Sequence, residues 1–317
     1  MLSVIIVSYN TENILRKALT HVYKQKFFTL FEVIVVDNAS RDNSCEMVRN
    51  EFPQVKLIRN PQNTGFAGGN NLGIKEAKGD YILLLNSDAY VFDDTFQQSI
   101  NHMTQHPKTG IMGVQLICEN GSPQPSAREF PTPWKKLKVM TGYDDVHPSF
   151  ESYYDYYDDS TQLSPEPRKV DWVPGTYFLI RREVVDEIGL LDENFFLYFE
   201  EVDYCFRAKK AGWNVVFNPK LSVIHLGGQS SLTTKKEISR DGKQLVDIRV
   251  NSEYYYYRKN SGLITMLMAA VVEIGWKSLV YVKNYFISDK FSPLKIDEAK
   301  LAINLVLLKM KKELVYN

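Results

Sequence analysis

The sequence lacks the glycine-rich signatures of two common classes of nucleotide-binding protein. The pattern G-x-G-x-x-G of dinucleotide-binding units is absent, and no Gly-Lys-Ser or Gly-Lys-Thr closes a phosphate-binding loop. The first absence excludes an NAD-dependent oxidoreductase. The second excludes a P-loop.

Cysteine is scarce and the net charge is zero. The three cysteines, Cys45, Cys118 and Cys205, show no metal-ligand spacing, and 38 basic residues balance 38 acidic ones. A general nucleic-acid-binding protein would be basic, so we expect no nucleic-acid partner. The N-terminal residues show no signal-peptide pattern, and together with the few cysteines this predicts a reducing cytoplasm.

Four short apolar runs each end in polar residues. They cover 2–10, 32–37, 55–60 and 81–88. Continuous apolar runs of this length are typical of strands buried on both faces. Helical patterns lie between the runs, so the sequence predicts βαβ units in an α/β fold, with a mostly parallel central sheet flanked by helices. The glycine-rich stretch from Asn63 is predicted as a loop, followed by a helix from about Gly69 to Ala77, and two further strands are predicted at 213–217 and 221–225.

Three acidic residues and a histidine lie next to these predicted elements. Asp37, Asp88, Glu201 and His225 each follow a strand or adjoin the start of a helix. Ligands bind at the carboxyl ends of strands in open α/β sheets, so neighbouring strands would bring these groups to one edge. Asp88 and His225 are suited to hold Mn²⁺ or Mg²⁺ on a diphosphate, and Glu201 to take a proton from a hydroxyl. A structural role for the lone histidine is an equal alternative.

Towards the C-terminus the alternation of predicted strands and helices gives way to predicted helices alone. A long apolar helix is predicted over 263–285, but Glu273, Lys277 and Lys283 interrupt it, and these charges argue against a membrane-spanning helix. An amphipathic helix follows over 297–314. Contact of these helices with a membrane surface and packing on the main domain are both open.

We therefore expect one main domain over 1–228 and a helical extension over 229–317. Within the main domain, 1–118 would be the nucleotide-binding half and 119–228 the acceptor-side half. The segment 143–167 is dense in Tyr, Asp, Ser and Pro. A lid or acceptor-binding segment and a plain surface insertion are equal alternatives for it.

Five segments in order along the chain resemble family 2 inverting glycosyltransferases of the GT-A fold. The resemblance extends over about 1–228 and is strongest to the rhamnosyltransferase-like branch that builds O-antigen and cell-wall polysaccharides. The segments are 4–10 (VIIVSYN), 35–40 (VVDNAS), 63–70 (NTGFAGGN), 84–88 (LLNSD) and 198–203 (YFEEVD).

The resemblance implies a role for each matching residue. It makes Glu201 the catalytic base, supported by Glu200 and Asp203, while Trp172 and Gly175 shape the acceptor side. Ten residues would bind the nucleotide sugar, and these are Ser8, Asn10, Asp37, Asn38, Asn63, Phe66, Gly68, Asn70, Asn86 and Ser87.

The resemblance also implies a metal site with few ligands. Asn86 stands where the family has the first acid of its Asp-x-Asp signature, so Asp88 is left as the one carboxylate, with His225 as its partner. Asp37 would read the edge of uracil or thymine.

The implied reaction moves a sugar from dTDP-rhamnose or a UDP-sugar to a hydroxyl of a glycan or lipid-linked glycan, in the cytoplasm or at the inner face of the membrane. An oligomer is open. Two alternatives are a transferase-like binding protein without activity and a sugar-nucleotide nucleotidyltransferase. The latter ordinarily carries a glycine- and arginine-rich loop after its first strand, and 8–12 (SYNTE) has none.

Overall fold

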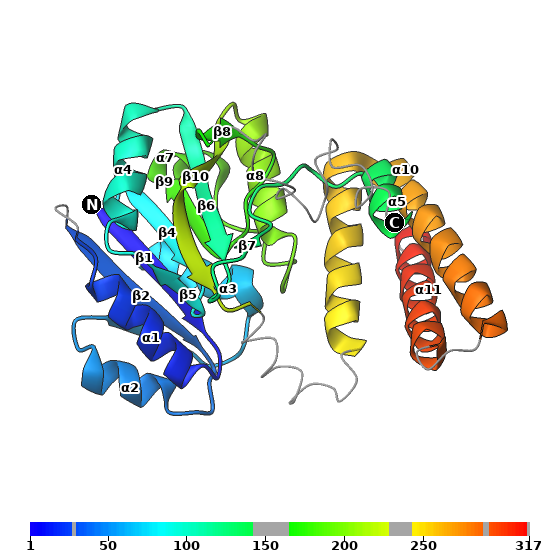
Figure 1. Ribbon diagram of the computed structural model, residues 1–317, viewed down its shortest axis with the longest axis horizontal. Helices are drawn as coiled ribbons and strands as arrows, with labels where there is room; N and C mark the ends of the chain where they lie inside the picture. The colour runs from blue at the N-terminus through cyan, green and yellow to red at the C-terminus, as the bar shows by residue number, and fades with distance from the viewer. Residues whose placement is uncertain (27–29, 142–164, 228–242, 288–291, 316–317) are drawn as a thin grey trace. The chain divides into compact units, whose positions relative to one another are not determined.

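The computed structural model describes residues 1–26, 30–141, 165–227, 243–287 and 292–315 (Figure 1). The predicted lid or insertion at 143–167 lies almost wholly outside these residues. The chain divides into two compact units: the first holds 1–130 and 156–236, and the second holds 131–155 and 237–317. The expected boundary at 228 stays a prediction.

The first unit is built on one ten-stranded sheet. Its main path has the order β3-β2-β1-β4-β9-β6-β10-β5, while β7 pairs with β6 and β8 with β10. The strands are β1 (Leu2–Ser8), β2 (Phe31–Asn38), β3 (Lys56–Asn60), β4 (Tyr81–Leu85), β5 (Ala89–Val91), β6 (Thr109–Ile117), β7 (Pro123–Gln124), β8 (Arg168–Lys169), β9 (Tyr177–Arg181) and β10 (Asn214–His225).

The central sheet is mostly parallel. Strands β1, β2, β3 and β4 pair in parallel, as do β6 and β10, and only β9 and β5 run against them along the main path. Parallel strands bring their carboxyl ends to the same edge. Polar residues that follow β1, β2 and β4 therefore lie near one another.

Alternate residues of the strands face two helical layers. Val4 and Ile6 of β1 belong to a core cluster with side chains of α1, α2 and α4, whereas Ile5 lies against Gly73 of α3. The helices of the first unit are α1 (Glu12–Tyr23), α2 (Ser44–Glu51), α3 (Gly65–Glu76), α4 (Thr95–Gln105), α7 (Arg182–Ile188) and α8 (Glu200–Lys210). Burial on both faces explains why the strands are continuous apolar runs.

Two elements differ from the sequence-based expectations. The glycine-rich segment, expected to be a loop up to about Gly69, is already helical from Gly65 onwards. The runs around 213–217 and 221–225, expected as two strands, form the single strand β10, which has a register irregularity between Asn218 and Ser222.

The second unit contains α5 (Pro133–Thr141), α10 (Lys243–Phe286) and α11 (Ser292–Val315). The backbone of α10 leaves helical geometry at Gly262, where φ is +85°. The Lys136 ammonium of α5 lies 2.6 Å from the carboxylates of both Glu253 and Glu273 on α10. This buried ion cluster holds α5 to α10.

Candidate active site

Buried hydroxyls connect the ends of β1 and β4. Ser8 Oγ lies 2.9 Å from Thr11 Oγ1, which donates to Ser87 Oγ at 3.4 Å. Ser8 and Ser87 are almost fully buried. Both predicted binding residues therefore lie at the expected edge, where they fix the loops that follow these strands.

Asp37, the residue before the last of β2, has an unfilled hydrogen-bonding position. Its Oδ2 accepts the Ser40 N–H at 3.2 Å, whereas its buried Oδ1 has no hydrogen-bond partner in the described part of the chain. Burial, reinforced by the neighbouring Asp37, raises the pKa of the Cys45 thiol to about 11, so that thiol stays protonated. A buried acceptor without a donor is costly, and a ligand N–H would satisfy it.

Asn10 ties the loop after β1 to the loop after β2. Its side-chain Oδ1 accepts the Arg41 N–H at 2.7 Å, and its backbone N–H donates to Ser40 Oγ at 3.0 Å. The residue has φ of +54°, a region that Asn tolerates better than most residues. These bonds shape the rim around Asp37.

Asn38 holds the start of α3 to β2. Its Nδ2 donates to Asn63 Oδ1 at 2.9 Å and to the Gly65 carbonyl at 3.0 Å, and its Oδ1 accepts from Asn60 Nδ2 at 2.8 Å. Asn63 Oδ1 also accepts the Gly65 N–H at 2.9 Å. The two predicted donor-pocket residues are thus bonded to one another and to the chain. We expect them to act by positioning the helix start.

The first turn of α3 reaches the acceptor-side half of the first unit. The Phe66 N–H donates to the Phe196 carbonyl at 2.8 Å, and a Cβ added to Gly175 would lie 2.9 Å from the Phe66 ring. Asn70 Nδ2 donates to the Phe66 carbonyl at 2.9 Å, while Gly68 leaves no room for a Cβ beside Thr64. These contacts bring predicted donor-side and acceptor-side residues together.

Asp88 and His225 face each other. His225 Nε2 lies 3.5 Å from Asp88 Oδ1, and the N–H of Leu226 donates to the Asp88 carbonyl at 3.1 Å. The separation suits two ligands of one cation. Among the described residues no group of three or more His, Cys, Asp or Glu side chains could hold a metal, so substrate oxygens would have to complete the coordination of Mg²⁺ or Mn²⁺.

Gln124, which the sequence did not single out, sets the state of His225. Gln124 Nε2 donates to the His225 carbonyl at 2.7 Å, so its Oε1 is the atom 2.8 Å from His225 Nδ1. An oxygen acceptor there requires Nδ1–H, which leaves the Nε2 lone pair directed at Asp88. Burial lowers the pKa of His225, although Asp88 opposes this. The imidazole is therefore neutral and suited to bind a metal.

Glu200 and Glu201 begin α8 after a strained turn. Tyr198 and Phe199 both have φ of +69°, which is uncommon for bulky residues and characteristic of functional sites. Burial raises the pKa of Glu201, while the positive charge of Arg128 and backbone hydrogen bonds lower it. Burial and the charge of Glu201 raise the pKa of Glu200.

A short chain of contacts connects Glu201 to the Asn86–Ser87–Asp88 turn. Backbone hydrogen bonding from Gly175 is among the interactions that lower the pKa of Glu201. The next residue, Thr176, accepts the Asn86 N–H at 3.0 Å through its carbonyl. The predicted base and the predicted metal turn therefore share one pair of neighbouring residues.

Two other predicted residues are part of the framework. Asp203 is fully buried and accepts from Arg207 Nε at 2.9 Å, and Arg207 also binds the Ile188 carbonyl at 2.7 Å. The buried Trp172 donates to the Glu129 carbonyl at 2.9 Å, with the Arg128 guanidinium 5.2 Å from its ring centroid. Asp203 anchors α8, and Trp172 holds Arg128.

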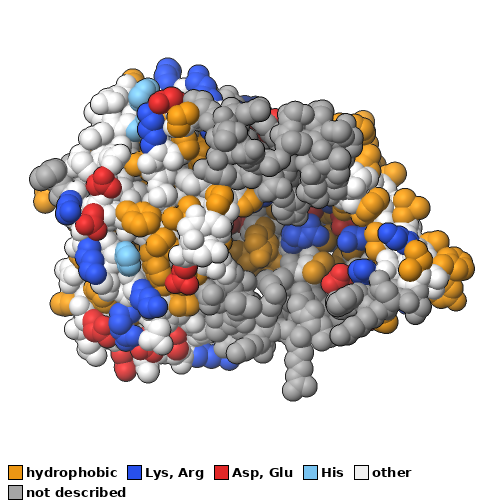
Figure 2. All heavy atoms as spheres, in the orientation of Figure 1, with side chains coloured by type: hydrophobic (Ala, Val, Ile, Leu, Met, Phe, Trp, Pro, Cys, Tyr) orange, Lys and Arg blue, Asp and Glu red, His pale blue; other side chains and the backbone are white. Residues whose placement is uncertain are grey.

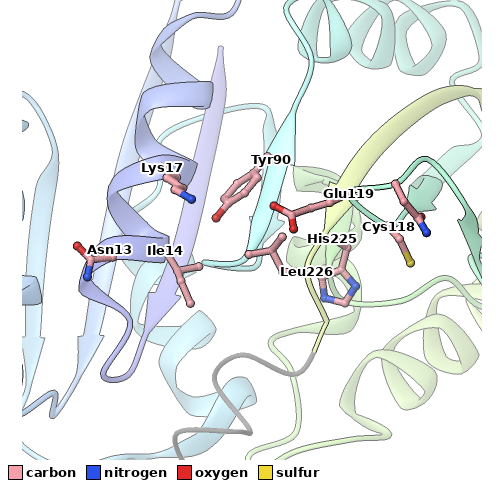
Figure 3. A pocket seen from close by; sticks show the side chains of 9 residues that line it. Asn13, Ile14, Lys17, Tyr90, Cys118, Glu119, His225 and Leu226 are labelled. Atoms are coloured by element: carbon pink, nitrogen blue, oxygen red, sulfur yellow. The ribbon is translucent and has the colours of Figure 1, made fainter.

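A cavity of about 520 Å³ adjoins the proposed metal pair (Figure 3). Lys17 and Ile14 approach it from α1, and Tyr90 lies between them and Glu119 of the turn after β6, with His225 beside Glu119 on the side away from α1. Burial and the nearby acids raise the pKa of Tyr90 to about 12, so its hydroxyl stays protonated. His225 is the one predicted site residue in the lining.

Comparison with known proteins gives matches over most of the first unit. The family model for glycosyl transferase family 2 matches residues 3–189. An N-acetylglucosaminyl-diphospho-decaprenol L-rhamnosyltransferase of Mycobacterium tuberculosis is 27% identical over 206 residues, 61% of this chain and 66% of the relative. The hexosyltransferase Agl10 of Haloferax volcanii, from low-salt glycan biosynthesis, is 27% identical over 71% of this chain and 66% of its own. The chain thus spans just under two thirds of the length of both relatives.

Solved structures support the fold. A mannosyltransferase of Pyrobaculum calidifontis, solved with GDP-Man and Mn²⁺, aligns with a TM-score of 0.53 at 14% identity over 98% of this chain and 86% of that one. Staphylococcus aureus TarS 1–349 aligns with a TM-score of 0.50 at 16% identity over 100% of this chain and 92% of that one. These likenesses and the mostly parallel sheet confirm the predicted GT-A fold with its C-terminal helices.

Proposed function

The chain is a member of glycosyl transferase family 2, and from this premise we propose that it inverts the anomeric centre of the sugar it transfers. The donor would be dTDP-rhamnose or a UDP-sugar, and the acceptor a hydroxyl of a glycan or lipid-linked glycan in surface-polysaccharide synthesis. The named functions of the rhamnosyltransferase and Agl10 relatives support this class of substrate. The observation that carries the proposal is the connection of Glu201 to the Asn86–Asp88 turn through Gly175 and Thr176.

The proposed reaction is a single displacement in which each residue has its own role. Glu201 takes the proton of the acceptor hydroxyl. That oxygen bonds to the anomeric carbon as the carbon–oxygen bond to the diphosphate breaks, and the nucleoside diphosphate leaves with the electron pair. General-base assistance of this kind contributes about 10²–10⁴-fold in rate. Asp37 would accept a base N–H of the nucleoside through its unfilled Oδ1.

Asp88 and His225 are the residues that would hold a divalent cation, since a carboxylate and a neutral imidazole suit Mn²⁺ and a carboxylate suits Mg²⁺. Such a cation would neutralise the charge that develops on the departing diphosphate.

The test combines one assay with two variants. The purified protein is incubated with dTDP-rhamnose and UDP-sugars, with a glycan acceptor and Mn²⁺, and NMR reports the anomeric configuration of the product. Glu201→Gln should keep donor binding and lose at least about 100-fold in transfer. Asp88→Ala should abolish Mn²⁺-dependent binding of the nucleoside diphosphate in calorimetry. Retention of configuration, or full activity of Glu201→Gln, would contradict the proposal.

A further inference from the structure

The second half of α10 exposes a continuous apolar face. Its members recur every three or four residues along one side of the helix, with Gly275 filling the one wider gap. They are Ile264, Met268, Val271, Leu279, Val282 and Phe286, and we call them the α10 stripe. Ile264 is 76% exposed and Phe286 is 78% exposed, and a Cβ on Gly275 would meet nothing within 4 Å. Water therefore contacts large apolar side chains over several turns.

The α10 stripe carries no charge. Between residues 263 and 282 the only charged residues are Glu273 and Lys277. Glu273 is fully buried on the opposite side, where it pairs with Lys136. By length and composition alone the helix Val246–Phe286 could cross a membrane, yet only 22% of its most apolar 18-residue window is buried. That fraction is low for the core helix of a soluble protein.

The packing of α11 argues against a spanning arrangement. The Lys300 ammonium lies 5.5 Å from the Tyr281 ring centroid, and Arg258 Nε lies 3.6 Å from Glu313 Oε2, so the two helices run antiparallel along each other. Exposed charges occur throughout α11, including Lys295, Asp297, Lys300, Lys311 and Lys312. A bilayer core would have to take up these charges together with α10, at a cost of several kcal/mol.

The part of the chain that carries the stripe has more lysines than acidic residues. Residues 263–317 contain eight lysines and five acidic residues, one of them the buried Glu273. Figure 2 shows basic side chains among the hydrophobic ones over these helices. A second copy of the same face would bring an equal excess of lysines and could not neutralise it, whereas anionic headgroups can. The exposed Tyr285 and Phe286 at the end of α10 suit the lipid–water interface.

We propose that the α10 stripe docks in the plane of an anionic lipid surface, with its apolar side chains among the acyl chains and the flanking lysines on the headgroups. Binding of this kind gains from both buried apolar area and electrostatic attraction.

The test is sedimentation of the full-length protein with vesicles, without donor or acceptor, so that its outcome is independent of the proposed catalytic function. Vesicles of phosphatidylcholine with phosphatidylglycerol should capture the protein, and vesicles of phosphatidylcholine alone should capture much less. Val271→Asp/Leu279→Asp should lower the partition coefficient at least ~10-fold. Lys283→Gln and Lys311→Gln should each lower it about fivefold. The matched control is Leu30→Asp on the first unit, where Leu30 is 80% exposed.

Three results would overturn the proposal. The first is a monomer that stays in the supernatant with anionic vesicles. The second is a dimer in light scattering that the Val271→Asp/Leu279→Asp variant dissociates, with no vesicle binding by either form; the stripe would then be a contact between copies. The third is resistance of the bound protein to alkaline carbonate, which would indicate a helix that spans the bilayer.

Discussion

Gln124 controls His225 through both ends of its amide, and this is the basis of a prediction at the scale of one residue. Gln124→Ala removes the acceptor of Nδ1–H, so the ring loses its tautomer and orientation. Loss of such an outer partner typically lowers metal affinity about 10–100-fold. Calorimetric titration with Mn²⁺ in the presence of nucleoside diphosphate measures this metal affinity. Gln97→Ala, on an exposed face of α4, should leave affinity unchanged, and equal affinity in both variants would refute the role of Gln124.

Burial and Arg128 shift the pKa of Glu201 in opposite directions, which gives a prediction in pH. In the proposed mechanism the rate requires ionised Glu201, whose pKa is raised by burial and lowered by Arg128. Activity should therefore fall as the pH falls through this raised pKa. Arg128→Gln should move the acid limb of kcat/KM to higher pH. Burial and the charge of Glu201 raise the pKa of Glu200, so its carboxyl is still protonated while Glu201 titrates, and Glu200→Gln should leave the limb near its wild-type position. Identical limbs in the two variants would show that another group controls the rate.

Which site residues could be predicted depended on where they stand in the chain. Asp37 and Asp88 follow apolar strands, and Glu201 begins a helix after an aromatic run, so sequence alone could point to them. Gln124 and Arg128 lie in an irregular, Pro- and Ser-rich stretch. Gln124 acts through hydrogen bonds with His225 and Arg128 through its charge on Glu201, about 100 and 70 residues away in the chain, and no local sequence pattern predicts such interactions.

At the scale of elements, α3 shows how tertiary contacts override propensity. Its glycines disfavour a helix by about 1 kcal/mol each relative to alanine, which is why a loop was expected there. In the structure Asn38 bonds the helix start, and Gly69 and Gly73 let the helix approach Val7 and Ile5 of β1. Sequence predicted the strands well because their burial on two faces is visible in composition. It missed this helix start because the compensating contacts are distant.

Gly65 provides the test of this explanation. It has φ of +73°, and a Cβ would lie 1.9 Å from the Phe196 carbonyl oxygen. Gly65→Ala should destabilise the protein by at least about 1–3 kcal/mol, from backbone strain and displacement of the turn, as measured by urea unfolding. Gly121 has φ of +82° but nothing within 4 Å of a Cβ, so Gly121→Ala is the matched control for strain alone. Equal losses of stability in Gly65→Ala and Gly121→Ala would contradict the explanation by a steric clash with Phe196.

On the scale of the whole molecule, the second unit is held together by charges as well as apolar contacts. Lys136 is buried between Glu253 and Glu273, and the Tyr254 hydroxyl donates to Glu273 at 2.9 Å. Helix α5 belongs to the same compact unit as α10 and α11, although Lys136 and Glu253 are 117 residues apart in the chain. Local sequence patterns cannot predict an ion pair between residues so far apart in the chain.

The buried cluster predicts a destabilised variant whose defect depends on pH. Lys136→Met leaves two buried carboxylates without their shared cation, a change that typically costs about 3–5 kcal/mol. Burial raises the pKa of Glu273, but Lys136, with Arg249 and the Tyr254 hydrogen bond, lowers it by more, so the net pKa is below its usual value. In the wild type this contribution is present at neutral pH and is lost as pH falls through the depressed pKa. In Lys136→Met the burial is still opposed by Arg249 and the Tyr254 hydrogen bond but no longer by Lys136, so Glu273 should protonate at higher pH and recover part of the lost stability.

Urea unfolding at about pH 8 and about pH 5 measures this difference. The difference in free energy of unfolding between wild type and Lys136→Met should be smaller at the lower pH. Lys56→Met is the control, because its ion pair with Glu76 is 2.5 Å long but both side chains are more than 40% exposed, and it should cost under about 1 kcal/mol. An equal difference in unfolding free energy at both pH values would contradict the assignment of the stability to the charge of Lys136. A loss of stability in Lys136→Met no larger than that in Lys56→Met would contradict it as well.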